Sequence, residues 1–125
     1  MTLPLTPHAL AAAYEYLRTT PPFKGWKLPE ADAIVFKVAR DSPCHGFHQR
    51  HTKYLSQGSE HCIGVSETSV GHTDTLFRVL GHEMIHMWQS ITRAQTAGTV
   101  HNAEFRRIAR LVCKTHGWDA KHFFF

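Results

Sequence analysis

A long amphipathic stretch in the second half of the chain constrains the fold more than any other part of the sequence. No proline occurs from Thr73 to Ala94, and apolar side chains recur there at helical spacing. The recurring side chains are Phe77, Leu80, Met84, Trp88 and Ile91. Such a repeat places them on one face of an α-helix, which Thr73 or Asp74 can cap. The stretch therefore predicts a long helix that packs against a core through this face.

The same helix contains the pattern His82-Glu83-x-x-His86. Residues four apart in a helix point to the same side, so the two imidazoles can bind one zinc ion. Glu83 points in another direction but can reach a water molecule at the ion, and it can take a proton from that water as the water attacks a carbonyl. The pattern therefore predicts His82 and His86 as zinc ligands and Glu83 as the general base of peptide-bond hydrolysis.

A catalytic zinc site needs a third protein ligand and one open position. Gln89 and Thr92 occupy the glycine and third-histidine positions of the HExxHxxGxxH pattern, so the chain is not a metzincin. His101 lies just before the predicted last helix, Glu104 lies one turn into it, and His116 lies near its end. From the residues alone these three stay open as the third ligand, and Glu104 could instead hydrogen-bond a ligand histidine.

The rest of the chain predicts an α+β fold around the long helix. Thr6 and Pro7 are typical of a helix start, and Gly117 is typical of a helix end. Residues 44–48 could begin a strand, although their pattern is ambiguous. The other predicted elements are a helix at 7–18, strands at 33–39 and 61–66, a turn at 56–60, the helix at 73–94, and a last helix at 102–116 with Phe105, Ile108, Ala109 and Val112 inward. The tail from Trp118 to Phe125 could dock on this fold or fray.

Length and composition predict a single domain, residues 1–125, inside the cell. A chain of 125 residues has the usual length of one domain. The longest apolar run, Ala9 to Tyr14, is far shorter than the about 20 residues that span a bilayer, and no Lys or Arg precedes Arg18 as in a secretory signal. Three cysteines, an odd number, argue against a disulfide framework. We therefore expect a cytoplasmic protein without a membrane partner, and association with the nucleoid is compatible with this compartment.

The basic excess of the chain raises the question of nucleic acid binding. The formal net charge is +4. The last helix contains four basic residues, Arg106, Arg107, Arg110 and Lys114, and only one acidic residue, Glu104. Such a stripe can bind phosphates, but a solvated helix face is the more ordinary interpretation. DNA is therefore a secondary hypothesis for a partner.

A second group of metal-binding residue types consists of Cys44, His45, His48 and His51. Their spacing matches no zinc knuckle, so we expect them at the surface and in the cleft without a bound metal ion. One of these histidines, or His72 or Tyr54, could stabilise the oxyanion that forms on a substrate carbonyl. The sequence does not choose among them.

Two motifs in order resemble those of a known family. The HExxH helix continues into an aromatic residue, Trp88, and His101-Asn102-x-x-Phe105 follows. This arrangement resembles the SprT-like zinc metallopeptidases, which include bacterial SprT and eukaryotic Spartan and have a third histidine in an H-[NG]-x-x-[FW] motif. Leu28-Pro29, Cys44-His-Gly-Phe47 and Ile63-Gly-Val-Ser66 are also similar, so the resemblance covers nearly the whole chain.

The resemblance implies a zincin-like, minimal gluzincin-like α+β domain. It implies one catalytic Zn²⁺ bound by His82, His86 and His101, with Glu83 as the general base. The implied activity is that of a zinc-dependent endopeptidase on protein or peptide substrates. In zincins a strand beside the metal cleft commonly pairs with an extended substrate, and residues 61–66 are the expected strand.

The printed sequence has no Cys-rich segment after the predicted last helix, so we expect a compact form of this family without the zinc ribbon of longer members. The DNA recruitment of Spartan depends partly on segments without a counterpart here, so DNA–protein crosslink processing is only a weak implication. The alternative function is a zinc-stabilised DNA-associated or partner-binding module with weak or conditional proteolysis. The sequence indicates no oligomeric state.

Overall fold

The computed structural model describes residues 5–39, 45–50, 61–67, 73–96 and 99–123. The elements are α1 (Pro7–Arg18), η1 (Ala31–Ala33), β1 (Ile34–Ala39), β2 (Gly46–Arg50), β3 (His61–Ser66), α2 (Thr73–Thr92), α3 (Ala103–His116) and η3 (Ala120–His122). They confirm the α+β class and the helices and strands expected from the sequence. The strand in the ambiguous region, β2, overlaps the expected residues 44–48 only from Gly46 onward. The turn expected at 56–60 lies outside the described residues.

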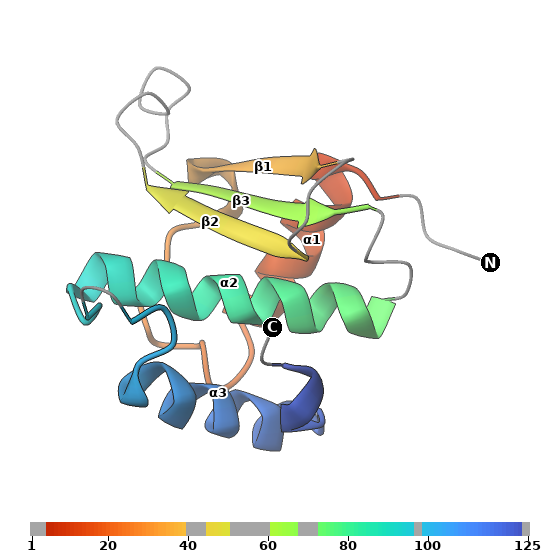
Figure 1. The fold of residues 1–125 in the computed structure, drawn as a ribbon. Coiled ribbons are helices and arrows are strands. Elements are labelled where there is room, and N and C mark those ends of the chain that lie inside the picture. Colours follow the sequence, from red (N-terminus) through yellow and green to blue (C-terminus); the bar gives the residue numbers. More distant parts are fainter. Residues whose placement is uncertain (1–4, 40–44, 51–60, 68–72, 97–98, 124–125) are drawn as a thin grey trace.

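The three strands form one mixed sheet in the order β1-β3-β2 (Figure 1). β1 runs parallel to β3 with Ile34 opposite His61, and β2 runs antiparallel with Gly46 opposite Val65. β3 therefore has neighbouring strands on both sides. The expectation that residues 61–66 pair with a substrate is wrong, because the edges of this central strand are already hydrogen-bonded. Among the described strands, β2 is the edge strand that packs on α2.

α2 lies in the middle of the molecule, with the sheet on one side and α3 on the other (Figure 1). Ile85 and Met87, outside the apolar face expected from the sequence, are fully buried, whereas Ile91 within that face is 37% exposed. The expectation of one buried face was incomplete because neighbouring elements cover this helix on two sides. His82 and Glu83 are consequently buried as well. None of the described helices has the combination of length and apolar character that a membrane crossing requires.

The part of the tail that the structure describes, Trp118 to Phe123, docks on α2 rather than fraying. Gly117, with a φ of 75°, ends α3 in the left-handed conformation and turns the chain back. Phe123 is fully buried. A Cβ atom at Gly81 would lie 3.3 Å from the ring of Trp118 and 3.5 Å from that of Phe123, so the missing side chain leaves room for the tail. The tail thereby becomes part of the core around α2.

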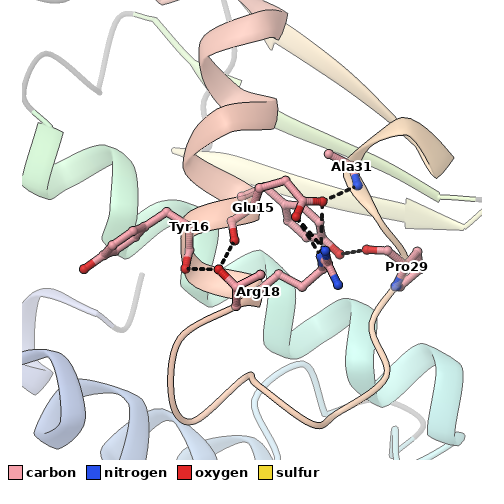
Figure 2. A network of polar contacts seen from close by, with 7 residues as sticks. Glu15, Tyr16, Arg18, Pro29 and Ala31 are labelled. Carbon is pink, nitrogen blue, oxygen red and sulfur yellow. Dashed lines mark hydrogen bonds and ion pairs between the residues drawn. The ribbon is translucent and has the colours of Figure 1, made fainter.

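A polar network ties α1 to the segment that leads into β1 (Figure 2). One carboxylate oxygen of Glu15 accepts a hydrogen bond from the backbone N–H of Ala31 at 2.7 Å, and the other accepts from the Arg18 guanidinium at 2.6 Å. The Tyr14 hydroxyl donates to the carbonyl of Pro29 at 2.5 Å. The bonds to Pro29 and Ala31 join residues that are 15 or 16 positions apart and hold β1 in place beside α1.

Replacing Glu15 with alanine is expected to lower the free energy of unfolding by about 1 kcal/mol at pH 7, because the Ala31 N–H and the Arg18 guanidinium lose their acceptor. The effect is small because solvent screens this half-exposed ion pair. The hydrogen bond from Arg18 lowers the pKa of Glu15, so this stabilisation exists above the carboxyl's ordinary pKa and is lost as the pH falls below it. Urea unfolding at pH 7 and pH 3 measures both effects. Glu104→Ala is the control, because its pair with Arg107 is exposed and lies within one helix, and a loss as large as that of Glu15→Ala would contradict the prediction.

Candidate metal centre

Three histidines each bring one ring nitrogen to a common point. Nε2 of His82 lies 3.2 Å from Nε2 of His86 and 3.1 Å from Nε2 of His101. His82 and His86 lie one turn apart on α2, and His101 immediately precedes Asn102, the N-cap of α3. Two nitrogen ligands of a tetrahedral zinc ion, with bonds of about 2.0 Å, are about 3.3 Å apart. The spacing and the chemistry of these three groups therefore fit a metal ion.

The hydrogen bond of His82 determines which of its nitrogens faces the other histidines. Its Nδ1 lies 2.9 Å from the backbone carbonyl of Phe123. Because a carbonyl only accepts hydrogen bonds, Nδ1 holds the proton of the neutral ring and Nε2 keeps its lone pair. Burial lowers the pKa of His82 to about 3 and that of His86 to about 4. Both rings therefore stay neutral near pH 7, as metal ligands must.

The phenyl ring of Phe105 lies against the histidine cluster. It stacks on His86 and on His101 with ring centroids 4.5 and 4.6 Å apart, and it meets His82 edge-on at 5.0 Å. Phe105 is fully buried in the first turn of α3. The sequence placed this residue in the core, and the structure shows that its part of the core supports all three rings.

A side-chain clasp joins α2 to the segment that contains His101. The Gln89 amide donates to Oδ1 of Asn102 at 2.9 Å, and the same oxygen accepts from the backbone N–H of Phe105 at 2.9 Å. The Asn102 amide in turn donates to the carbonyl of Ala94 at 3.0 Å. Because Asn102 directly follows His101, the clasp holds that imidazole near α2. The role of Asn102 was not predicted from the sequence, although an asparagine before a helix is a typical N-cap signal.

A cleft of about 530 Å³ opens in front of the cluster. Its lining residues are His45, Gly46, Phe47, His48, His82, Glu83, His86, Gln95, Val100 and His101. Glu83 is only 4% exposed, and burial raises its pKa to about 8. A Cβ atom at Gly46 would lie 2.6 Å from Val79 and 3.4 Å from Cγ of Glu83, so β2 packs closely against the Glu83 side chain. A buried carboxyl with a raised pKa therefore lines the same cleft as the three histidines.

The other two candidates for a third ligand lie elsewhere. The Glu104 carboxylate accepts from the Arg107 guanidinium at 2.7 Å. The His116 ring stacks on Trp118 at 4.7 Å, at the opposite end of α3. Neither side chain belongs to the cluster of potential metal ligands found among the described residues. The geometry thus brings His101, and not these alternatives, to the two histidines of α2.

Only some of the residues expected in or near the cleft belong to the part of the chain that the structure describes. His45 and His48 line the cleft, whereas Cys44, His51, Tyr54 and His72 lie outside the described residues. Nε2 of His48 lies 2.9 Å from Nδ1 of His61, and their rings stack at 5.2 Å. His48 is therefore held on β2 by a partner in the central strand.

The environment of His48 predicts a specific pH dependence of stability. Burial, assisted by the nearby His61, His86 and Arg50, lowers the pKa of His48 to about 3. In the unfolded chain this residue binds a proton as the pH falls below about 6.5, whereas in the folded protein it binds none until near pH 3. The free energy of unfolding therefore decreases with falling pH by up to about 1.4 kcal/mol per pH unit. In metal-free protein, urea unfolding between pH 4.5 and 6 should show this slope reduced in His48→Gln, which retains a hydrogen-bonding group. Equal slopes in the two proteins would exclude this cause.

Comparison with known proteins agrees with this arrangement. The sequence model of the SprT-like family matches residues 23–122, which include the three clustered histidines, Glu83 and Phe105. No curated protein matches the sequence significantly. Since the family match covers most of the chain, the protein belongs to the SprT-like family.

Proposed function

We propose that the protein is a zinc-dependent endopeptidase in which His82, His86 and His101 bind the ion. The main support is the convergence of three Nε2 atoms beside the buried carboxyl of Glu83 in an open cleft. Three neutral imidazoles with a further open position are typical of catalytic zinc. Membership of the SprT-like family is consistent with a metallopeptidase.

In this proposal the residues of the chain orient the reactants and move the proton. Zinc, when bound, supplies Lewis acidity and activates water. The Glu83 carboxylate accepts a proton from the attacking water and donates it to the amine that leaves as the C–N bond breaks. Burial strengthens Glu83 as a base because it disfavours the charged carboxylate. The Phe123 carbonyl and the clasp of Gln89 and Asn102 hold the ligand rings during this chemistry.

The edge strand β2, rather than β3, is proposed to bind the substrate. The Ser66 N–H donates to the carbonyl of His45, which makes this a hydrogen-bonded pair of the antiparallel ladder. Such pairs alternate along the ladder, so the peptide groups of Gly46 and His48 face away from β3. These residues also line the cleft. An extended, unfolded polypeptide could therefore add as a further strand beside the cluster.

Metal analysis combined with a cleavage assay tests the proposed function. Untagged protein should contain one zinc ion per chain by mass spectrometry and should cleave denatured casein. A chelator should remove both the metal and the cleavage, and added zinc should restore them. Cleavage that continues in metal-free protein, or a protein that does not bind supplied zinc, would overturn the proposal.

A second candidate function, association with DNA, is supported by the surface of α3. Arg106, Arg110 and Lys114 are exposed along this helix. Binding through these side chains should weaken steeply between 50 and 200 mM salt and should be lost when all three are replaced by glutamine. If DNA also accelerated cleavage of a DNA-bound protein, crosslink processing would be favoured. Affinity that does not change with salt would contradict this second function.

A further inference from the structure

His82, whose Nε2 faces His86 and His101, contacts a residue that is 41 positions away in the chain. His82 is 2% exposed, and its Nδ1 lies 2.9 Å from the backbone carbonyl of Phe123. The two rings also contact each other, with centroids 5.6 Å apart. This carbonyl holds the proton at Nδ1 and directs the lone pair of Nε2 toward His86 and His101.

The carbonyl is held in place by the docking of a short turn. After Gly117, Asp119 caps η3 by accepting from the backbone N–H of Lys121 at 2.9 Å, and the N–H of Phe123 donates to the carbonyl of Ala120 at 3.1 Å. The ring of Phe123 is fully buried and stacks with Trp118 at 6.2 Å. Both rings lie over Gly81, the residue that directly precedes His82. The turn thus packs on the same turn of α2 that presents the metal-facing imidazole.

We infer that the segment from Trp118 to Phe123 is a positioning element of the metal site, in which the Phe123 carbonyl sets the tautomer and orientation of His82. The inference rests on the proposed function, because it takes the histidine cluster to bind zinc. Without the docked carbonyl, a neutral His82 can place its proton on either nitrogen, and a buried Nδ1–H has lost its acceptor. Loss of such an outer partner typically weakens metal binding by about 10–100-fold.

Zinc affinity measured by competition with a chromophoric chelator tests the inference with matched variants. Phe123→Ala removes the apolar anchor of the turn and should weaken zinc binding by about 10–100-fold. Phe123→Leu keeps a large buried apolar side chain and should bind zinc within about threefold of wild type. Phe23→Ala is the control, because Phe23 is equally buried but packs against Trp26 rather than a clustered histidine. It should retain wild-type affinity.

A spectroscopic measurement on the wild-type protein does not depend on any variant folding. Long-range proton–nitrogen NMR spectra of metal-free protein labelled with ¹⁵N-histidine should show His82 protonated at Nδ1, with slow exchange of that proton. His82→Gln identifies the signal. A proton at Nε2, or equal zinc affinity in Phe123→Ala and wild type, would overturn the inference alone. Equal weakening in Phe23→Ala would also overturn it, because general stability would then explain the effect. A wild-type protein without zinc affinity would overturn the proposed function together with the inference.

Discussion

Glu83→Gln is expected to reduce the rate of casein cleavage by about 10²–10⁴-fold while leaving zinc bound. The amide has nearly the shape of the carboxyl but cannot accept and return a proton. The fold should not suffer, because burial raises the pKa of Glu83 to about 8 and the metal-free protein therefore has a neutral, protonated side chain here at pH 7. The required measurements are steady-state cleavage, zinc content and urea unfolding of both proteins.

Glu83→Asp serves as the companion variant. It keeps the carboxyl but shortens the side chain by one methylene, so it should retain part of the activity lost in Glu83→Gln. Cleavage by Glu83→Gln within tenfold of wild type would show that another group accepts the proton. His45 and His48 would then be the first residues to examine, because both line the cleft.

His101→Ala is expected to weaken zinc binding by two to four powers of ten and to abolish cleavage. Zinc sites built from protein side chains bind with about 10–16 kcal/mol, and one of three ligands accounts for about a third of that. The structure makes this residue decisive because its Nε2 lies 3.1 Å from Nε2 of His82. Competition with a chelator of known affinity measures the loss.

Glu104→Gln is the matched control for His101→Ala. The Glu104 carboxylate accepts from Arg107, so its replacement should leave the zinc affinity unchanged. If zinc affinity were instead lost in Glu104→Gln and retained in His101→Ala, the assignment of the third ligand would be reversed. The two residues are three positions apart in the sequence. The expected zinc affinities of their variants differ because His101 faces the other histidines whereas Glu104 is paired with Arg107.

Local sequence signals predicted most of the secondary structure correctly. Thr6 caps α1 by accepting from the N–H of Ala9, and Gly117 ends α3 with a positive φ. The alternating pattern of residues 61–66 coincides with β3. Caps and periodicities of this kind involve residues within about four positions of each other. All the interacting groups are therefore neighbours in the sequence, and the sequence alone identifies them.

Contacts between distant segments account for what the sequence did not predict. β3 has the composition of a strand, but nothing within its six residues shows that β1 and β2 flank it on both sides. The apolar repeat of α2 identified a helix with one buried face, whereas the sheet and α3 together bury most of its central turns. From the residues alone Glu104 and His101 were both chemically suited to bind a metal. The family resemblance favoured His101, and the path of the chain into α3 brings its Nε2 within 3.1 Å of Nε2 of His82.

The sequence by itself determined the long helix, the position of His82, Glu83 and His86 on it, and the side-chain chemistry available for a metal site. Helical periodicity is enough to bring residues four apart together. Only the tertiary structure decided that His101 completes the cluster, that Glu83 is buried, and that β2 borders the cleft. It also selected the carbonyl of Phe123 as the partner of His82. Every residue has a backbone carbonyl, so the residue types in the sequence do not indicate which carbonyl will lie beside a given imidazole in the folded chain.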